Sequence, residues 1–207
     1  MTRIFLHGLG QTPSVWQPVL RRLEPELPVY CPSLAELAGE NPRYPDLLHA
    51  LEESLAKMPG PLHLCGLSLG GVLALDYALR HQERVASLVL CATPVTMPRK
   101  LLRLQDFLFR LMPARAFEGS GFGREAMREL TGSMAELDFS GQLAELLCPV
   151  LVLCGSRDRA NRQAARQLSE HLPMARLHWI AGAGHELNTD SPEIMAELLR
   201  GFYQSLR

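Results

Sequence analysis

Short apolar runs recur along the chain, and stretches with helical periodicity separate most of them. The runs lack a strict alternation of apolar and polar residues, which is typical of strands that are covered on both faces. Strands that alternate with helices indicate a parallel sheet with helices on both sides. The predicted strands are 3–7, 27–31, 62–66, 85–92, 149–155 and 175–181.

The helical periodicity is clearest in three segments. One follows Thr12, a second begins near Pro45, and a last one begins near Pro192. No sequence repeat and no linker divides the chain. The sequence therefore predicts an α/β fold, with a doubly wound, mainly parallel six-stranded sheet in a single domain over residues 1–207.

One connection breaks this rhythm. From Pro94 to Cys148 the chain runs through several helical pieces separated by proline and glycine, far longer than a simple crossover needs. Long excursions in compact domains are usually functional. We predict that 95–147 is a short helical lid or cap inserted between the fourth and fifth strands. The alternative is that these helices only complete the cover of the sheet.

Composition narrows the class of protein. Of the 207 residues, 47% are hydrophobic and 21% charged, and the net charge is −1, as in ordinary globular proteins. A nucleic-acid-binding domain usually carries a clear basic excess, which is missing here. The amino terminus lacks the pattern of a signal peptide, and the leucine-rich run 62–79 is interrupted by polar residues and glycine. We expect a cytoplasmic protein.

The cysteines do not indicate a disulfide framework or a metal site. Their number is odd, most lie inside apolar runs, and their spacing matches no metal-ligand motif. We interpret them as small buried hydrophobic residues in a reducing compartment. They are Cys31, Cys65, Cys91, Cys148 and Cys154.

The strongest motif is Gly66-Leu67-Ser68-Leu69-Gly70, a G-x-S-x-G sequence with a predicted strand before it and a predicted helix after it. A serine at the tip of such a turn has a strained backbone, and side chains in place of the glycines would collide with the neighbouring strand or helix. The turn exposes the hydroxyl near the positive end of the helix. Ser68 is the candidate nucleophile. The alternative is a purely structural glycine turn.

A base and an acid follow in the order expected for this motif. Asp158 comes after the fifth strand and His185 after the sixth, so both are expected at the sheet edge that carries Ser68. The order Ser, Asp, His predicts a catalytic triad. Alternatively, Asp158 caps the next helix and His185 serves turn geometry. Asp190 and Asp138 are the alternative acids.

Two backbone amides are candidates for an oxyanion hole. The loops after the first and third strands flank the crevice where α/β sheets bind ligands. We therefore assign the N–H groups of Leu9 and Leu69 as oxyanion donors. No histidine pair has metal-binding spacing, and the elbow lacks a P-loop lysine, so no metal and no cofactor are expected. His7 is expected to brace its loop by hydrogen bonding.

These motifs together resemble the α/β-hydrolase superfamily over nearly the whole chain: H-G after the first strand, G-x-S-x-G after the third, "GSRD" and "GAGH". Within it the sequence is similar to small single-domain serine carboxylesterases, grouped with the biotin-pathway methyl esterase and the menaquinone-pathway lyase. The resemblance implies a Ser-Asp-His triad and a lid of variable shape. Relatives commonly begin with an antiparallel strand pair, whereas here the H-G strand starts at residue 3, so we expect six parallel strands.

Substrate contacts are predicted from apolar side chains. The segment "LLRLQDFLFRLM" offers an apolar wall for a short or medium acyl chain, and the alternative is a helix packed on the core. Its basic residues could meet a carboxylate or a carrier's phosphate, or form a solvated face; they are Arg99, Lys100, Arg103, Arg110 and Arg115. The candidate substrate-binding residues are Trp16, Phe107, Leu108 and Leu111.

The sequence-based hypothesis is a serine hydrolase that cleaves a carboxylic ester or thioester through an acyl-enzyme. One alternative is a lyase or a carbon–carbon bond hydrolase with the same triad, and another is a non-catalytic ligand-binding homologue. The expected partner is a small-molecule ester, with an acyl-carrier-linked substrate as an alternative. Neither nucleic acid nor stable membrane insertion is expected, and the chain is expected to be a monomer or a small homo-oligomer.

Overall fold

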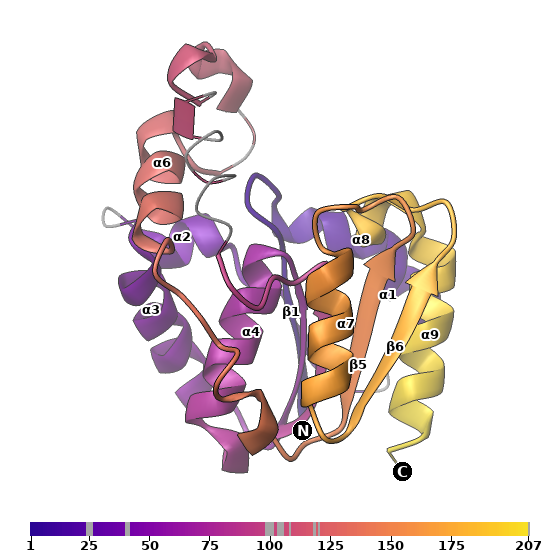
Figure 1. Ribbon diagram of the computed structural model, residues 1–207. Coiled ribbons are helices and arrows are strands. Elements are labelled where there is room, and N and C mark those ends of the chain that lie inside the picture. The colour runs from indigo at the N-terminus through magenta and orange to yellow at the C-terminus, as the bar shows by residue number, and fades with distance from the viewer. Residues whose placement is uncertain are drawn as a thin grey trace.

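The computed structural model contains one six-stranded sheet in the order β2-β1-β3-β4-β5-β6, and every neighbouring pair is parallel (Figure 1). This confirms the predicted fold class. The structure describes residues 1–23, 27–39, 42–97, 102, 106–107, 109–117, 119 and 121–206. The strands are β1 (Thr2–Leu6), β2 (Val29–Tyr30), β3 (Leu62–Leu67), β4 (Val85–Cys91), β5 (Val150–Gly155) and β6 (Ala175–Ile180).

The second strand is shorter than its apolar run suggests. Only Val29 and Tyr30 pair with β1, opposite Arg3 and Ile4. The run contains Pro28, which has no N–H to donate, although its carbonyl accepts a hydrogen bond from the Arg3 N–H at 2.9 Å. Proline is tolerated at the edge of a sheet, and β2 is an edge strand.

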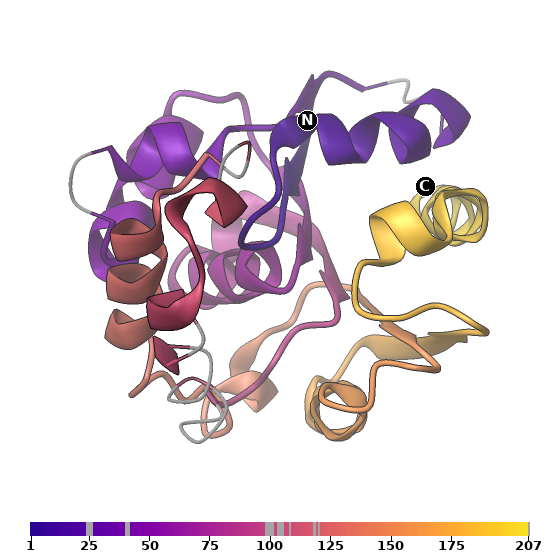
Figure 2. The ribbon, with the colours of Figure 1, turned by 90° about the horizontal axis from the view of Figure 1, so that it is seen from above.

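Helices cover both faces of the sheet. Helices α1, α8 and α9 lie on one face, and α3, α4 and α7 lie on the other (Figure 2). The helices are α1 (Gln17–Leu23), α2 (Leu34–Ala38), α3 (Tyr44–Ala56), α4 (Leu69–Arg80), α6 (Arg124–Ser133), α7 (Arg162–His171), α8 (Leu187–Asp190) and α9 (Pro192–Gln204). Short 3₁₀ helices are η1 (Pro13–Trp16), η2 (Gln82–Arg84), η3 (Ala114–Phe117) and η4 (Leu143–Glu145).

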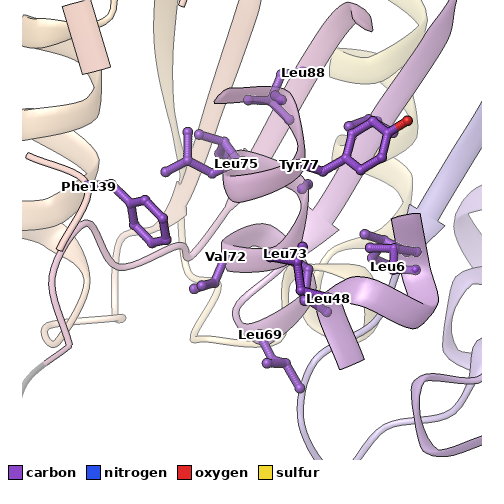
Figure 3. Packing of buried hydrophobic residues seen from close by; sticks show 14 of the residues in the cluster. Leu6, Leu48, Leu69, Val72, Leu73, Leu75, Tyr77, Leu88 and Phe139 are labelled. Carbon is purple, nitrogen blue, oxygen red and sulfur yellow. The ribbon is translucent and has the colours of Figure 1, made fainter. Parts of the chain in front are cut away.

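Two hydrophobic clusters explain why the strands show no polar alternation. Along β1, Ile4 and Leu6 belong to the cluster under α3 and α4, whereas Phe5 belongs to the cluster under α1 and α9. Successive side chains of a strand point to opposite faces, so both faces must be apolar when both are covered. Figure 3 shows Leu6 of the sheet close to side chains of α4 such as Leu73.

The segment between β4 and β5 contains η3, α6 and η4. Helix α6 packs against α3, where the backbone N–H of Tyr44 donates to Ser133 Oγ at 2.8 Å. Of this segment, η3 and α6 rise above the upper ends of α3 and α4, whereas η4 lies near the lower end of the molecule (Figure 1). Among the helices that the structure describes, none combines the length and apolar character needed to cross a membrane.

A buried polar contact joins α3 to α4, the helix that begins directly after Ser68. The Tyr44 hydroxyl donates to Asp76 Oδ2 at 2.9 Å, and Arg80 Nε donates to Asp76 Oδ1 at 2.6 Å. Burial, together with the charge of Asp76, raises the pKa of Tyr44 far above its ordinary value. Tyr44 therefore keeps its hydroxyl proton at neutral pH and donates it to Asp76.

We predict that Tyr44→Phe lowers the free energy of unfolding by about 1–3 kcal/mol, because it removes a hydrogen bond to a buried charged group. The control is Tyr30→Phe, which removes a half-buried hydroxyl contact to neutral Ser54 and is expected to cost about 0.5–1 kcal/mol. Urea unfolding followed by circular dichroism measures both. Equal losses in the two variants would contradict this account of the α3–α4 contact.

Candidate active site

Ser68 lies at the sharp turn between β3 and α4. Its backbone has φ 51° and ψ −113°, a conformation that a residue with a side chain rarely adopts. Its N–H donates to the Cys91 carbonyl at 2.9 Å, and its own carbonyl accepts from the Val72 N–H at 2.9 Å. These bonds to β4 and α4 hold the strained residue in place at the wall of the cavity, where Ser68 is half-buried.

The two glycines of the motif are required by backbone contacts. A Cβ added to Gly66 would lie 2.1 Å from the Gly70 carbonyl oxygen, and one added to Gly70 would lie 2.2 Å from the Leu6 carbonyl oxygen. Any side chain at either position would overlap the main chain. The start of α4 thus rests directly on the end of β1, which brings the Ser68 turn next to the loop that follows β1.

Asp158 and His185 are in hydrogen-bond contact. His185 Nδ1 lies 2.9 Å from Asp158 Oδ2; the Asp158 side chain is only 4% exposed, whereas that of His185 is 45% exposed. Burial opposes ionisation of Asp158, but the hydrogen bonds from His185 and Asn161 outweigh it and hold the pKa of Asp158 below its ordinary value. An ionised Asp158 fixes the tautomer in which Nδ1 carries the proton and Nε2 is free to act as a base.

The loops that carry this pair are bound to each other through their main chains. A Cβ on Gly155 would lie 2.1 Å from the Gly184 carbonyl oxygen, so only glycine permits this approach. The Arg157 N–H donates to the Ala183 carbonyl at 2.9 Å. The contact between the end of β5 and the loop after β6 sets the short distance between Asp158 and His185.

The two alternative acids lie elsewhere. Asp190 Oδ2 accepts the Gly184 N–H at 2.7 Å and so stabilises the histidine loop from within. Asp138 Oδ1 accepts from the backbone N–H and the hydroxyl of Ser140. Asp158 is therefore the carboxylate that contacts His185 in the described part of the chain.

Asn161 is a site residue that sequence reasoning missed. Its Nδ2 lies 2.9 Å from Asp158 Oδ2 and 3.2 Å from His185 Nδ1, and its backbone N–H donates to Asp158 Oδ1 at 3.3 Å. It is the residue before α7 and lines the cavity. The only sequence signal was its position three residues after Asp158, where an aspartate commonly accepts a backbone N–H at a helix start.

A second missed contact joins the loop after β1 to α8, the short helix that follows His185. Gln11 and Asn188 exchange two side-chain hydrogen bonds at 3.4 and 3.2 Å, and both are buried, 177 positions apart in sequence. Gln11 Oε1 also accepts the Gly8 N–H at 3.1 Å. The amide pair therefore fixes the position of the Gly8-Leu9 loop relative to the histidine loop.

His7 also contacts the loop after β1. The Leu34 N–H donates to His7 Nε2 at 3.1 Å, so the proton lies on Nδ1, which is 2.9 Å from the Gly8 carbonyl. Burial lowers the pKa of His7, more than the hydrogen bond to Gly8 raises it, and keeps the ring neutral at pH 7. This arrangement braces the loop rather than supplying a reacting group.

A cavity of about 950 Å³ contains the candidate residues. Leu9 and Leu69, the proposed oxyanion donors, lie in its wall together with Ser68, Asp158 and His185. The other lining residues that the structure describes are Gly10, Val72, Pro94, Val95, Thr96, Met97, Leu102, Phe109, Met112, Phe117, Met127, Thr131, Met134, Ala160, Asn161, Gln163, Ala164 and Gln167.

Three of the four predicted substrate-binding residues lie in the described part of the chain, and none of these three lines the cavity. Trp16 is fully buried on the opposite face of the sheet, where its ring centroid lies 5.2 Å from that of Phe5. Phe107 and Leu111 point outward, being 56% and 68% exposed. Leu108 lies outside the described residues. The structure thus corrects the expectation for Trp16, Phe107 and Leu111.

The correction has a physical reason in the phase of the insertion's helical periodicity. Phe109 lines the cavity, and helical positions two residues before and after it are turned away from it by about 200°. Phe107 and Leu111 fall on the other side. Among the basic residues of this segment, Arg110 pairs with Asp106 at 2.8 Å, and Arg99, Lys100 and Arg103 lie outside the described residues.

Within the residues that the structure describes, no group of three or more His, Cys, Asp or Glu side chains could hold a metal ion. The chemistry that the described site offers is that of a serine hydroxyl, an imidazole paired with a carboxylate, and backbone N–H groups. This arrangement is suited to nucleophilic attack on a carbonyl carbon.

Comparisons with known proteins show which family and which proteins this chain resembles. The chain is 29% identical, over 239 aligned positions and 95% of each chain, to a pimeloyl-[acyl-carrier protein] methyl ester esterase from Aromatoleum aromaticum. It is 26% identical to 2-hydroxy-6-oxononadienedioate/2-hydroxy-6-oxononatrienedioate hydrolase 2 from Pseudomonas putida, over 98% of this chain and 87% of the relative.

Among solved structures, MenH from S. aureus superposes with a TM-score of 0.84 at 17% identity, over 100% of this chain and 94% of that one. The family model described as "Alpha/beta hydrolase family" matches residues 4–198. Since this match spans almost the whole sequence and the observed fold agrees with it, the chain belongs to the alpha/beta hydrolase family.

Proposed function

We propose that this protein hydrolyses a carboxylic ester, with Ser68 as nucleophile, His185 as general base and acid, and Asp158 as the carboxylate that orients His185. The observation that carries the proposal is the 2.9 Å contact between His185 and buried Asp158, in the same cavity wall as the strained Ser68. The relative from Aromatoleum aromaticum, a methyl ester esterase by name, supports an ester as the substrate.

The proposed reaction has two halves. Ser68 Oγ attacks the ester carbonyl while His185 Nε2 takes the hydroxyl proton, and His185 then gives that proton to the departing alcohol. Water then attacks the acyl-enzyme and loses a proton to His185, which returns the proton to Ser68 as the acid is released. One water is consumed, and one alcohol and one carboxylic acid are formed.

The negative charge on the carbonyl oxygen requires stabilisation in both halves. We assign this role to the N–H groups of Leu9 and Leu69, the latter at the start of α4, where the helix dipole is positive. Hydrogen bonds made by the Gln11–Asn188 pair and by His7 hold the Leu9 loop in position. The insertion between β4 and β5 is the proposed lid, since Phe109, Phe117 and Met127 cover the cavity.

A second candidate function is cleavage of a carbon–carbon bond next to a carbonyl. The Pseudomonas putida relative is by name a hydrolase of a hydroxy-oxo-dienedioate, a compound with a ketone and two carboxylates but no ester bond to hydrolyse. The same nucleophile and oxyanion donors would serve it, so substrate tests decide between the two. The Aromatoleum aromaticum relative acts, by its name, on an acyl group attached to a carrier protein. The alternative for this protein is therefore a natural ester whose acyl group is attached to a carrier protein.

We predict that the purified protein hydrolyses p-nitrophenyl esters and that Ser68→Ala lowers kcat by about 10⁴-fold or more, because the covalent route is lost. The matched control is Ser156→Ala, a serine outside the cavity lining whose hydroxyl accepts the Gly182 N–H. Spectrophotometric release of p-nitrophenol measures both. Full turnover in Ser68→Ala would overturn the assignment.

The buried His7 ring makes the stability of the protein depend on pH. Burial lowers the pKa of His7 in the folded state, so the unfolded chain binds a proton first as the pH falls below about 6.5. Stability from this group is therefore complete above pH 6.5 and is lost as the pH falls toward the lower folded-state pKa. We expect His7→Gln to make the free energy of unfolding depend less on pH in this range, because the titrating ring is removed. The same variant should lower kcat at neutral pH, because the Leu9 loop moves.

His63 provides the control, because burial and the neighbouring Arg3 also lower its pKa, but it lies in β3 among residues that do not line the cavity. His63→Gln is expected to flatten the stability loss while kcat stays within about twofold of the wild type. Urea unfolding between pH 5.5 and 7.5, with kcat at pH 7.5, tests both variants. An unchanged kcat in His7→Gln would remove His7 from the account of the oxyanion loop.

A further inference from the structure

The cavity has two unlike ends. On the side of α6, its walls are buried and apolar: Val95, Met97, Phe117, Met127 and Met134 are each between 1% and 8% exposed. On the side of α7, its walls are partly open to solvent and carry neutral amide side chains, those of Asn161, Gln163 and Gln167. Seen from above, α6 and α7 lie on different sides of α4 (Figure 2).

The reacting groups lie between these ends. Ser68 and Leu69 are at the start of α4. On the α6 side, the terminal methyl of Met127 would lie 3.7 Å from a Cβ on Gly10, so it is next to the Leu9-Gly10 loop. On the α7 side, Asn161 Nδ2 lies 3.2 Å from His185 Nδ1. The cavity therefore passes from buried methionines, past Ser68, to His185 and the amides.

The direction of the substrate follows from the proton transfer. His185 must deliver a proton to the oxygen of the departing alcohol, so that oxygen and the group attached to it lie on the His185 side. The acyl chain, on the other substituent of the carbonyl carbon, extends away from His185. His185 Nδ1 is bound to Asp158 and lies near Asn161, the residue before α7, so Nε2 is the atom that faces the substrate. His185 therefore stands at the α7 end of the cavity, where Gln163 and Gln167 also line the wall, and we place the alcohol toward α7 and the acyl chain toward α6.

We propose that the enzyme selects its substrate by the acyl chain and tolerates varied alcohols: an unbranched apolar acyl chain of medium length lies against Met127 and Met134, and the alcohol lies against Gln163 and Gln167. This inference rests on the proposed ester hydrolysis.

The chemistry of the two ends gives each a different selectivity. Each CH₂ buried in an apolar wall strengthens binding about fourfold, so the α6 side rewards chain length until its space is filled. Methionine side chains are flexible and polarisable, which suits a linear chain that must bend. The α7 side is open, so a larger or polar alcohol keeps its contact with water and meets amides that donate and accept hydrogen bonds.

The test uses one bulky substitution at each end. Met127→Trp fills the α6 side and Gln167→Trp narrows the α7 side. Exposed positions on the same helices provide the controls, Glu129→Trp on α6 and Arg166→Trp on α7, since neither lines the cavity. Each variant is assayed with methyl esters of butanoate to dodecanoate and with octanoate esters of methanol, propanol and glycerol.

We expect the wild type to prefer a medium acyl chain and to vary less than about fivefold among the alcohols. Met127→Trp should lower kcat/KM for methyl octanoate at least tenfold relative to methyl butanoate, with the order of alcohols unchanged. Gln167→Trp should slow glyceryl octanoate at least fivefold relative to methyl octanoate, with the chain-length profile unchanged. Both controls should behave as the wild type does.

The reverse pattern, in which Met127→Trp changes the alcohol preference and Gln167→Trp the chain-length profile, would overturn the assignment of the two ends. Equal effects of both variants on both series would also overturn it. If the wild type hydrolyses none of these esters, the result contradicts the proposed ester hydrolysis itself. That result is distinct from a wrong assignment of the two ends. Circular dichroism verifies folding, and Met134→Trp replaces Met127→Trp if that variant does not fold.

Discussion

The site depends on close approach of backbone to backbone at one edge of the sheet. A Cβ at Gly70 would lie 2.2 Å from the Leu6 carbonyl oxygen, and one at Gly155 would lie 2.1 Å from that of Gly184. The first contact joins the Ser68 turn to the loop after β1, and the second joins the Asp158 loop to the His185 loop. Parallel strands bring these four loops to one edge of the sheet. The loops reach backbone contact because glycine has no Cβ that would overlap the neighbouring carbonyl oxygen.

The packing of the rest of the fold maintains a strained backbone conformation at this edge of the sheet. Ser68 has a positive φ that costs free energy of order 1–3 kcal/mol and persists because its surroundings determine it. Two apolar clusters cover the sheet, one on each face, and the cluster under α3 and α4 contributes to the almost complete burial of α4 from Leu69 to Ala78. The helix on one side of the turn and the strand on the other hold Ser68 in this conformation at the wall of the cavity.

The fold and the pairing of Asp158 with His185 followed from the sequence because their signals are local. Apolar runs and the glycine pattern around Ser68 are readable within a few residues. The Gln11–Asn188 pair gives no such signal, since its members lie 177 positions apart and pair only through the fold. The sequence also does not show which side of the insertion's helical segment faces the cavity. Phe107 and Phe109 are equally apolar, and only the structure shows that Phe109 lines the cavity while Phe107 is exposed.

The central claim is that four loops at one sheet edge activate a single serine. The direct measurement is the rate of covalent modification by a fluorophosphonate, with the modified residue located by peptide mass spectrometry, in the wild type and in His185→Gln. The account predicts one adduct, on Ser68, formed at least a hundredfold more slowly in the variant. An adduct on another residue, or equal rates in the two proteins, would contradict it.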